Sequence, residues 1–185
     1  LWSESFDREL EDIFAVQEEI SRRISNILRE KLTINELAQP LVKKYTSNIN
    51  AYSIYLKGLY YWNKFTPEMT SKAIDMFNQV IQIEPEFPLS YARLSGCYTY
   101  LGATGIMKPE LAYPRAKDLA YKALDMDNTL EDCHLAIGMV KFFYEWDFDG
   151  AEASFLKALE INSGYGTGYL YYSMFLSGMY RLKQA

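Results

Sequence analysis

Histidine and cysteine, the side chains that most often hold transition metals, are scarce in this sequence. It contains one histidine, His134, and two cysteines, Cys97 and Cys133, among 185 residues. A metal site with two histidines cannot form within one chain, and the cysteines lack the close spacing of zinc ligands. Both cysteines lie in apolar stretches with helical periodicity, so we expect buried thiols, with a disulfide as the alternative. The sequence therefore predicts neither a metal nor a cofactor.

Positive charge is also in short supply. The chain has 19 Lys and Arg against 24 Asp and Glu, which gives a formal net charge of −5. Binding to nucleic acid requires a basic stripe, and binding to an anionic membrane requires a cluster of Lys and Arg. The sequence contains neither, so we expect no nucleic acid and no membrane among its partners.

One long stretch lacks charge altogether. No charged residue occurs from Ile161 to Tyr180, which is about the length of a membrane-spanning helix. The stretch contains four glycines and lies where the repeat pattern described below places a helix, so we interpret it as a repeat helix. The residues after Leu1 are acidic and polar and do not resemble an apolar secretory leader. We therefore expect a cytoplasmic location, with the periplasm as the alternative.

Motifs that carry catalysis are missing as well. The glycines of GYGTG, residues 164–168, alternate, and the motif lacks both the dinucleotide-binding spacing and a lysine for phosphate. DMDNTLED is not a calcium loop, because Leu130 and Ala136 stand where that loop needs glycine and glutamate. The sequence therefore predicts no catalytic residue, and we do not expect an enzyme.

The sequence does contain one motif that occurs several times. AIDMFNQVIQIEP begins at Ala73, AKDLAYKALDMDN at Ala116 and AEASFLKALEIN at Ala151, and a further small residue follows at Ala185. These starting points lie 43, 35 and 34 residues apart. In each full copy Phe or Ala follows the first alanine by four positions, so the two share one face of a helix. A small residue beside a ring allows a neighbouring helix to approach closely and receive that ring.

The pattern predicts a pair of helices in each repeat. First helices are expected at 48–63, from 88, at 130–144 and at 166–179, and second helices at 67–84, from 114 and at 151–161. The insertion ATGIMKPELAY before Pro114 is expected to be a surface loop, with a lid over a groove as the alternative. We expect Asp149 at or near the N-cap of the helix that contains Ala151, and Trp146 and Phe148 between the two helices of that repeat.

A helical pattern with a period near 34 residues resembles the tetratricopeptide repeat. The family's Leu, small, Tyr, Leu and Gly positions are matched by Leu94, Ser95, Tyr98, Leu101 and Gly102. The resemblance implies an all-α fold, a right-handed α-solenoid of tetratricopeptide helix-turn-helix repeats preceded by a long amphipathic helix.

The opening residues, LWSESFDRELEDIFAVQEEISRRI, are similar to the tail of a TolB-like α/β domain. In many bacterial signalling proteins that domain precedes a tetratricopeptide array, behind an adenylate cyclase, kinase or winged-helix regulator module. NAYSIYLKGLYYWNK and VKFFYEWDFDGAEASFLKALEIN extend the resemblance over most of the chain. LWSESF alternates like a strand, and Arg8–Lys31 has the apolar stripe of the long helix. We expect residues 1–46 to be the TolB-like tail with connecting helices, and 47–185 the array, with repeats at about 48–87, 88–128, 129–163 and an incomplete 164–185.

If the register of the repeats holds, the first helices line a concave groove. The resemblance places eight residues in it: Tyr61, Trp62, Thr99, Tyr100, Phe142, Phe143, Leu170 and Met174. Such a groove is aromatic and apolar. An aromatic stripe at helical spacing is also typical of a core, and the sequence leaves these two interpretations open.

The sequence therefore predicts a protein-protein interaction scaffold, which binds a protein or peptide, or its own upstream effector domain, in the concave groove. Aromatic anchors suit that role, because they are large and lose little rotamer entropy on binding. One alternative is a ligand-sensing regulatory region of a signalling protein. Another is self-association into a homodimer through the open C-terminal end, where the helix 166–179 is apolar nearly all round.

Overall fold

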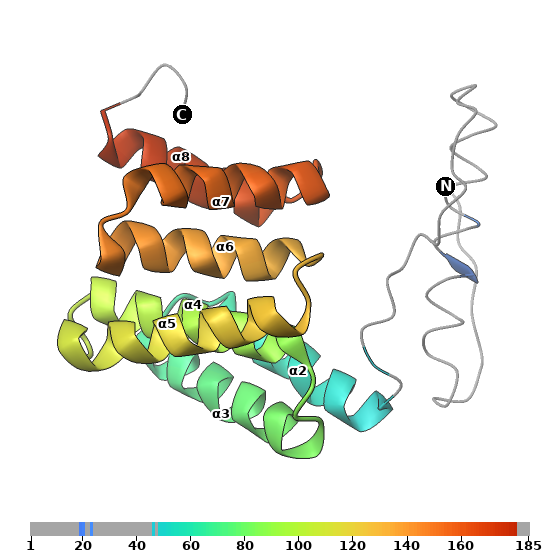
Figure 1. The fold of residues 1–185 in the computed structure, drawn as a ribbon. Helices are drawn as coiled ribbons and strands as arrows, with labels where there is room; N and C mark the ends of the chain where they lie inside the picture. The colour runs from blue at the N-terminus through green and yellow to red at the C-terminus, as the bar shows by residue number, and fades with distance from the viewer. Residues whose placement is uncertain (1–18, 21–22, 24–45, 47, 181–185) are drawn as a thin grey trace, which may run out of the picture. The chain divides into compact units, whose positions relative to one another are not determined.

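The computed structural model describes residues 19, 20, 23, 46 and 48–180 (Figure 1). The chain divides into two compact units, Leu1–Asn50 and Ala51–Ala185. In the first unit Arg23 forms an ion pair of 2.7 Å with Glu19, one helical turn away. The predicted strand LWSESF, most of the predicted helix Arg8–Lys31 and the TolB-like tail lie outside the described residues.

Antiparallel helix pairs make up the described part of the second unit. The first helices are α2 (Ile49–Trp62), α4 (Pro88–Ala103), α6 (Glu131–Val140), which continues as the π-helix η2 (Lys141–Glu145), and α8 (Gly166–Gly178). The second helices are α3 (Pro67–Ile83), α5 (Pro109–Met126) and α7 (Phe148–Ile161). Figure 1 shows the α4–α5 turn, the α6–α7 turn and the end of α8 along one edge of the stack. No strand occurs within residues 48–180, so the prediction of an all-α helical-repeat solenoid is confirmed.

A glycine on the first helix makes room for a phenylalanine ring from the second helix of the same pair. A Cβ added at Gly58 would lie 2.6 Å from Cε1 of Phe77, and one added at Gly138 would lie 2.7 Å from Cε1 of Phe155. Both rings are almost completely buried. The predicted close contact between small and aromatic positions is thus confirmed in the first and third pairs.

The middle pair, α4 and α5, is joined differently. Its second helix has Ala120 where the other two have phenylalanine. Here the hydroxyl of Ser95 donates a hydrogen bond of 2.8 Å to the carbonyl oxygen of Ala116 across the pair. A buried hydrogen bond therefore takes part in a contact that is made elsewhere by a ring and a glycine.

Proline marks the beginning of three helices. Pro67, Pro88 and Pro109 each occupy the first turn, where the missing backbone N–H would have had no partner within the helix. The prediction that Pro114 begins α5 is wrong, because the helix begins at Pro109 and Pro114 lies inside it. Most of the insertion is therefore helical, and only a short turn joins α4 to α5. The expected surface loop is therefore confined to residues 104–108, which are non-helical and mostly exposed, and the rest of the insertion extends the helices.

The turn between η2 and α7 also differs from its prediction. The N-cap of α7 is Asp147 and not Asp149, and its side chain accepts a hydrogen bond of 2.9 Å from the backbone N–H of Gly150. Asp147 also pairs with Lys141 at 2.9 Å. Trp146 does not fill the space between the helices, since its side chain is 73% exposed and its backbone is left-handed, with φ of 57°. Phe148 does pack against the buried cluster of this repeat, as predicted.

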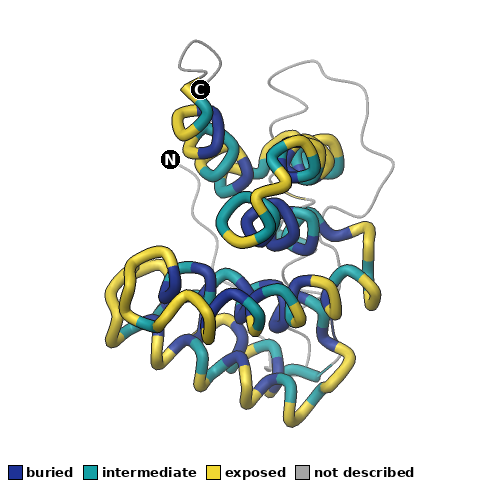
Figure 2. The backbone as a smooth tube through the Cα atoms, turned by 60° about the vertical axis from the view of Figure 1, so that its left-hand side comes forward, coloured by how far each residue is buried: buried dark blue, intermediate teal, exposed yellow. Residues whose placement is uncertain are grey.

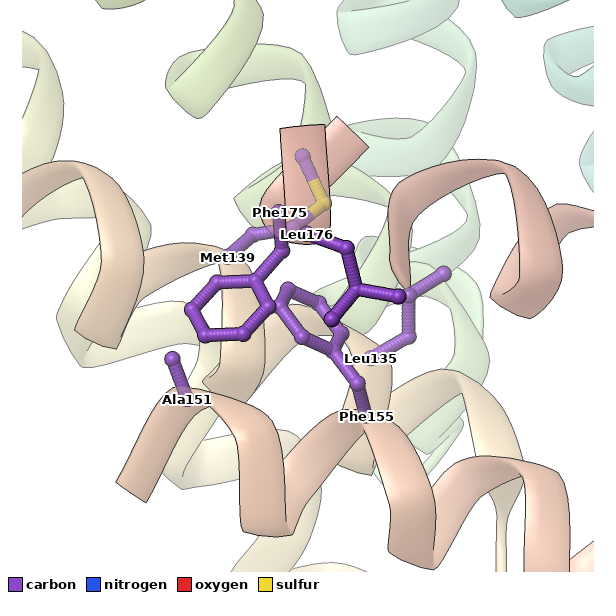
Figure 3. Close-up of a cluster of buried hydrophobic side chains, with 6 residues drawn as sticks. All are labelled: Leu135, Met139, Ala151, Phe155, Phe175 and Leu176. Atoms are coloured by element: carbon purple, nitrogen blue, oxygen red, sulfur yellow. The ribbon is translucent and has the colours of Figure 1, made fainter. Parts of the chain in front are cut away.

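That cluster joins the last three helices. It consists of Leu135 and Met139 from α6, Ala151 and Phe155 from α7, and Phe175 and Leu176 from α8 (Figure 3). Figure 2 shows the same distribution along the whole stack, with buried residues on the sides where helices face one another and exposed residues at the turns. The core is therefore a series of contacts between neighbouring helices, as expected for a repeat array.

Candidate functional site

All four first helices contribute to one recess in the second unit. The recess has a free volume of about 20 Å³, which is room for about one water molecule. Its lining residues come from α2, α4, α6 and α8, and they are Trp62, Ala92, Arg93, Gly96, Asp132, Leu135, Ala136, Met139, Thr167 and Tyr171. Since every first helix supplies a wall, the shape of the recess depends on how the repeats stack.

A polar network crosses the recess. Nη2 of Arg93 on α4 lies 2.6 Å from Oδ1 of Asp132 on α6, and the two side chains are 18% and 12% exposed. The hydroxyl of Tyr165, which precedes α8, donates a hydrogen bond of 2.5 Å to the same oxygen of Asp132. Nε of Arg93 donates a longer bond of 3.5 Å to the hydroxyl of Tyr55 on α2. The network therefore connects all the pairs around one ion pair.

The tyrosines in and beside this network hold their protons strongly. Burial raises the pKa of Tyr55 from 10.0 to about 12, although the nearby charge of Arg93 acts in the opposite direction. Burial and the charge of Asp132 raise the pKa of Tyr165, and burial raises that of Tyr171. These hydroxyls are therefore neutral at physiological pH, where the charges of Arg93 and Asp132 cancel.

The structure distributes the predicted groove residues of α2 and α4 between the recess and the interior. Trp62 lines the recess but is only 5% exposed, and its ring meets that of Tyr100 edge to face at 5.9 Å. Tyr100 is half-buried, and its hydroxyl donates to the carbonyl oxygen of Phe65 at 3.1 Å. Thr99 has no exposed surface, and its hydroxyl donates to the carbonyl oxygen of Ser95, so it belongs to the interior.

The remaining predicted residues lie away from the recess lining. Tyr61 is half-buried at the end of α2. Phe142 and Phe143 are half-buried in η2 and pack on the cluster of Figure 3, where the Phe142 ring lies 5.3 Å from that of Phe175. Leu170 and Met174 are 52% and 47% exposed on α8.

A second, open hollow lies between α7 and α8 on the last repeat. Leu170 takes part in its lining, and Met174 does not. The hollow is lined by Leu156, Leu159, Glu160, Tyr169, Leu170, Tyr172, Ser173 and Leu176. This apolar surface corresponds to the end at which the sequence predicts self-association.

Sequence reasoning missed the ion pair at the centre of the recess. Arg93 could have indicated a buried ion pair, because it is the one charged residue in the 16 residues of α4. Asp132 was harder to distinguish, since it follows Glu131 in the acidic first turn of α6, a usual position for helix-stabilising carboxylates. That Arg93 meets Asp132 depends on the packing of α4 against α6, which a single sequence does not display.

The described residues contain no candidate metal centre. Within them, no group of three or more His, Cys, Asp or Glu side chains is placed to hold a metal ion. Cys97 and Cys133 are buried and free, as expected, and burial raises the pKa of the Cys97 thiol. None of the helices in the described part of the chain has the length and hydropathy that a membrane span requires.

Solved structures with the same arrangement of helices are tetratricopeptide-repeat domains. The chain superposes on the Sgt2 TPR domain of Aspergillus fumigatus with a TM-score of 0.53, at 18% identity, over 74% of this chain and 83% of that one. This chain has the tetratricopeptide-repeat fold. The TPR domain of Arabidopsis OM64 gives a TM-score of 0.51 at 15% identity, over 68% and 93% of the two chains. The first TPR of Spaghetti (RPAP3), bound to the HSP90 peptide SRMEEVD, gives 0.53 at 13% identity, over 74% and 98%.

Curated proteins with similar sequences are much longer. "Putative adenylate cyclase 3" of Rhizobium meliloti (strain 1021) is 30% identical over 141 residues, which are 75% of this chain and 24% of that protein. The transcriptional regulator HilA of Salmonella typhimurium is 23% identical over 136 residues, 71% of this chain and 24% of the regulator. The chain thus spans about a quarter of the length of these relatives. No protein-family model matches it.

Proposed function

We propose that the helical repeats bind a segment of a partner protein, or of another domain of the same protein, across the concave face formed by α2, α4, α6 and α8. The observation that carries this proposal is the recess, whose walls come from all four first helices. A free volume of about 20 Å³ admits no large side chain, so the partner segment lies across the opening.

One of the comparisons supports this proposal. One structural neighbour, the first TPR of RPAP3, is described as bound to a peptide, so the fold is compatible with peptide binding. A small-molecule sensor usually has a pocket of about 300–1,000 Å³, which is far larger than the free volume of the recess. The open hollow between α7 and α8 described above has a free volume of about 630 Å³, so the ligand-sensing alternative stays a prediction that these volumes do not decide.

We further propose that this stretch belongs to a larger cytoplasmic signalling protein. The two relatives are named as an adenylate cyclase and a transcriptional regulator, and the matched region is a quarter of each. In this view residues 1–46 are the end of a TolB-like domain, and 47–185 form the array that communicates with an effector domain. Expression of the complete protein with and without residues 47–185, followed by an assay of the effector activity, would test this arrangement.

A blocking substitution at the rim of the recess tests the scaffold proposal. Thr167 is half-buried and lines the recess, so Thr167→Arg would place a long charged side chain over the opening. The matched control is Ala153→Arg at an exposed position on α7. Peptides that bind the chain, selected from a random dodecapeptide library on phage, should lose at least about ten-fold in affinity with Thr167→Arg and keep it with Ala153→Arg. Equal affinity for the two variants, or failure to select any peptide, would contradict the proposal.

Self-association is the second candidate, favoured by the open hollow between α7 and α8. Leu156, Tyr169, Leu170 and Met174 are all substantially exposed there or beside it. Contiguous exposed apolar surface is a feature of interaction sites. A homodimer through this end would bury it.

A further inference from the structure

We infer that the recess selects partner segments that bring an uncharged, apolar side chain to it, and that it disfavours segments that bring a carboxylate. This inference rests on the proposed function, because it specifies the chemistry of the partner that the concave face binds. Three features of the recess lead to it: the neutralised cation, the anion that stays behind it, and the apolar walls.

The cation of the recess is already neutralised. Among the ten lining residues Arg93 is the one cation and Asp132 the one anion, and their atoms are 2.6 Å apart. Both side chains are largely shielded from water, at 18% and 12% exposed. Charges that are shielded in this way attract each other more strongly than charges at the surface. The recess consequently offers no net positive charge to a partner.

An incoming carboxylate would meet repulsion as well as competition. To reach Arg93 it would have to displace Asp132, whose Oδ1 is also held by the hydroxyl of Tyr165 at 2.5 Å. Asp132 would then remain beside the newcomer as a second anion, and like charges in a shielded site repel each other strongly. The formal net charge of −5 on the whole chain adds a long-range repulsion of acidic segments.

The walls of the recess suit an apolar side chain instead. The parts of Trp62, Leu135 and Met139 that reach the recess are aromatic and aliphatic, and each residue is at most 5% exposed, so the side chain that meets them is a small one. Tyr171 adds a ring whose hydroxyl stays protonated, because burial raises its pKa. Aromatic residues and Met are enriched where protein interfaces lose contact with water, and Asp and Glu are depleted there. Shape and charge thus select the same kind of partner.

The first test uses the composition of peptides that bind the unmodified full chain. Dodecapeptides are selected on phage, and only those whose binding is weakened by Thr167→Arg are included. These are the peptides that bind at the concave face. Asp and Glu should then occur at less than about half their frequency in the unselected library. A frequency at or above that of the library would overturn the inference.

The second test removes the anion and uses the acidic peptide SRMEEVD as the probe. In Asp132→Asn the charge of Arg93 is no longer cancelled, so SRMEEVD should bind this variant at least about ten-fold more tightly than the unmodified chain. Asp125→Asn, which removes one negative charge at an exposed position on α5, should bind the probe like the unmodified chain. Equal affinity of the unmodified chain and Asp132→Asn would overturn the inference.

The two tests separate this inference from the proposed function. Circular dichroism shows whether Asp132→Asn folds, and if it does not, the library composition on the unmodified chain decides. Peptides that are insensitive to Thr167→Arg contradict the proposed function itself. Peptides that are sensitive to Thr167→Arg but rich in Asp and Glu contradict only the inference about charge.

Discussion

Gly138→Ala is the sharpest test of how the helix pairs are held together. The added methyl carbon would lie 2.7 Å from both Cδ1 and Cε1 of Phe155 and 3.1 Å from Cζ, closer than carbon atoms approach without repulsion. The ring cannot move away freely, since it also contacts the rings of Phe175 and Tyr172, at 5.7 and 6.3 Å between centroids. Overpacking of this kind typically costs about 1–3 kcal/mol.

Part of this cost is offset by helix propensity. Alanine favours a helix interior over glycine by about 1 kcal/mol, so the expected net loss in the free energy of unfolding is about 0–2 kcal/mol. Gly166→Ala is the matched control, because a Cβ at Gly166 meets no atom within 4 Å at the start of α8. That variant should be unchanged or up to about 1 kcal/mol more stable.

Urea denaturation followed by far-ultraviolet circular dichroism would measure both variants. A Gly138→Ala protein as stable as Gly166→Ala would refute the argument that a ring fills the space left by the glycine. Phe155→Leu in both backgrounds completes a double-mutant cycle, in which the added methyl should cost less once the ring is gone.

Three other predictions concern the recess and the ends of the stack. Because burial raises the pKa of Tyr55 from 10.0 to about 12, the unfolded chain releases this proton at a lower pH than the folded chain. The contribution of this proton to the free energy of unfolding is therefore complete below pH 10 and falls by as much as about 3 kcal/mol as the pH approaches 12. In urea titrations at about pH 9 and about pH 11, Tyr55→Phe should lose less stability between the two pH values than the unmodified chain. An equal loss in both proteins would count against the burial of this hydroxyl. Trp62→Ala should lower stability by about 3–5 kcal/mol, as truncation of a buried aromatic does. Trp146→Ala should change stability by less than about 0.5 kcal/mol, because that side chain is 73% exposed. Thermal melts in which Trp146→Ala is the less stable variant would contradict the assignment of Trp62 to the interior and Trp146 to the surface. Leu170→Lys should reduce self-association in light scattering, and an unmodified chain that stays monomeric at high concentration would remove the homodimer proposal.

The repeating part of the fold could be predicted because it depends on neighbours along the chain. A small residue four positions before a ring places both on one helix face, and this local rule predicts that Ala73 and Phe77 face a neighbouring helix, where the structure brings Phe77 against Gly58. Proline before an apolar run likewise predicts the beginnings of α3 and α4. Each of these features needs only the periodicity of a helix and the geometry of its first turn.

The recess could not be predicted in the same way, because it depends on contacts between repeats. Arg93 meets Asp132 across two helices that are separated by the whole of α5. The register of the family places Thr99 in the groove, but the structure buries this residue. The charged recess lies about two turns earlier on α4, at Arg93. The prediction that α5 begins at Pro114 was wrong for a related reason. A proline is compatible with the beginning of a helix, but Pro109 also satisfies that rule, and the sequence does not rank the two.

The π-helix Lys141–Glu145 has a consequence for how such a chain can change in length. A single extra residue in an α-helix rotates everything after it by about 100°, since one turn takes 3.6 residues. A π turn contains one residue more than an α turn, and this one lies between Gly138 and Phe155, which are 17 residues apart where Gly58 and Phe77 are 19 apart. Phe155 nevertheless returns to Gly138 as Phe77 returns to Gly58. Connections of different length are therefore compatible with the same contact between ring and glycine, and a π turn lets a first helix hold an extra residue without losing it.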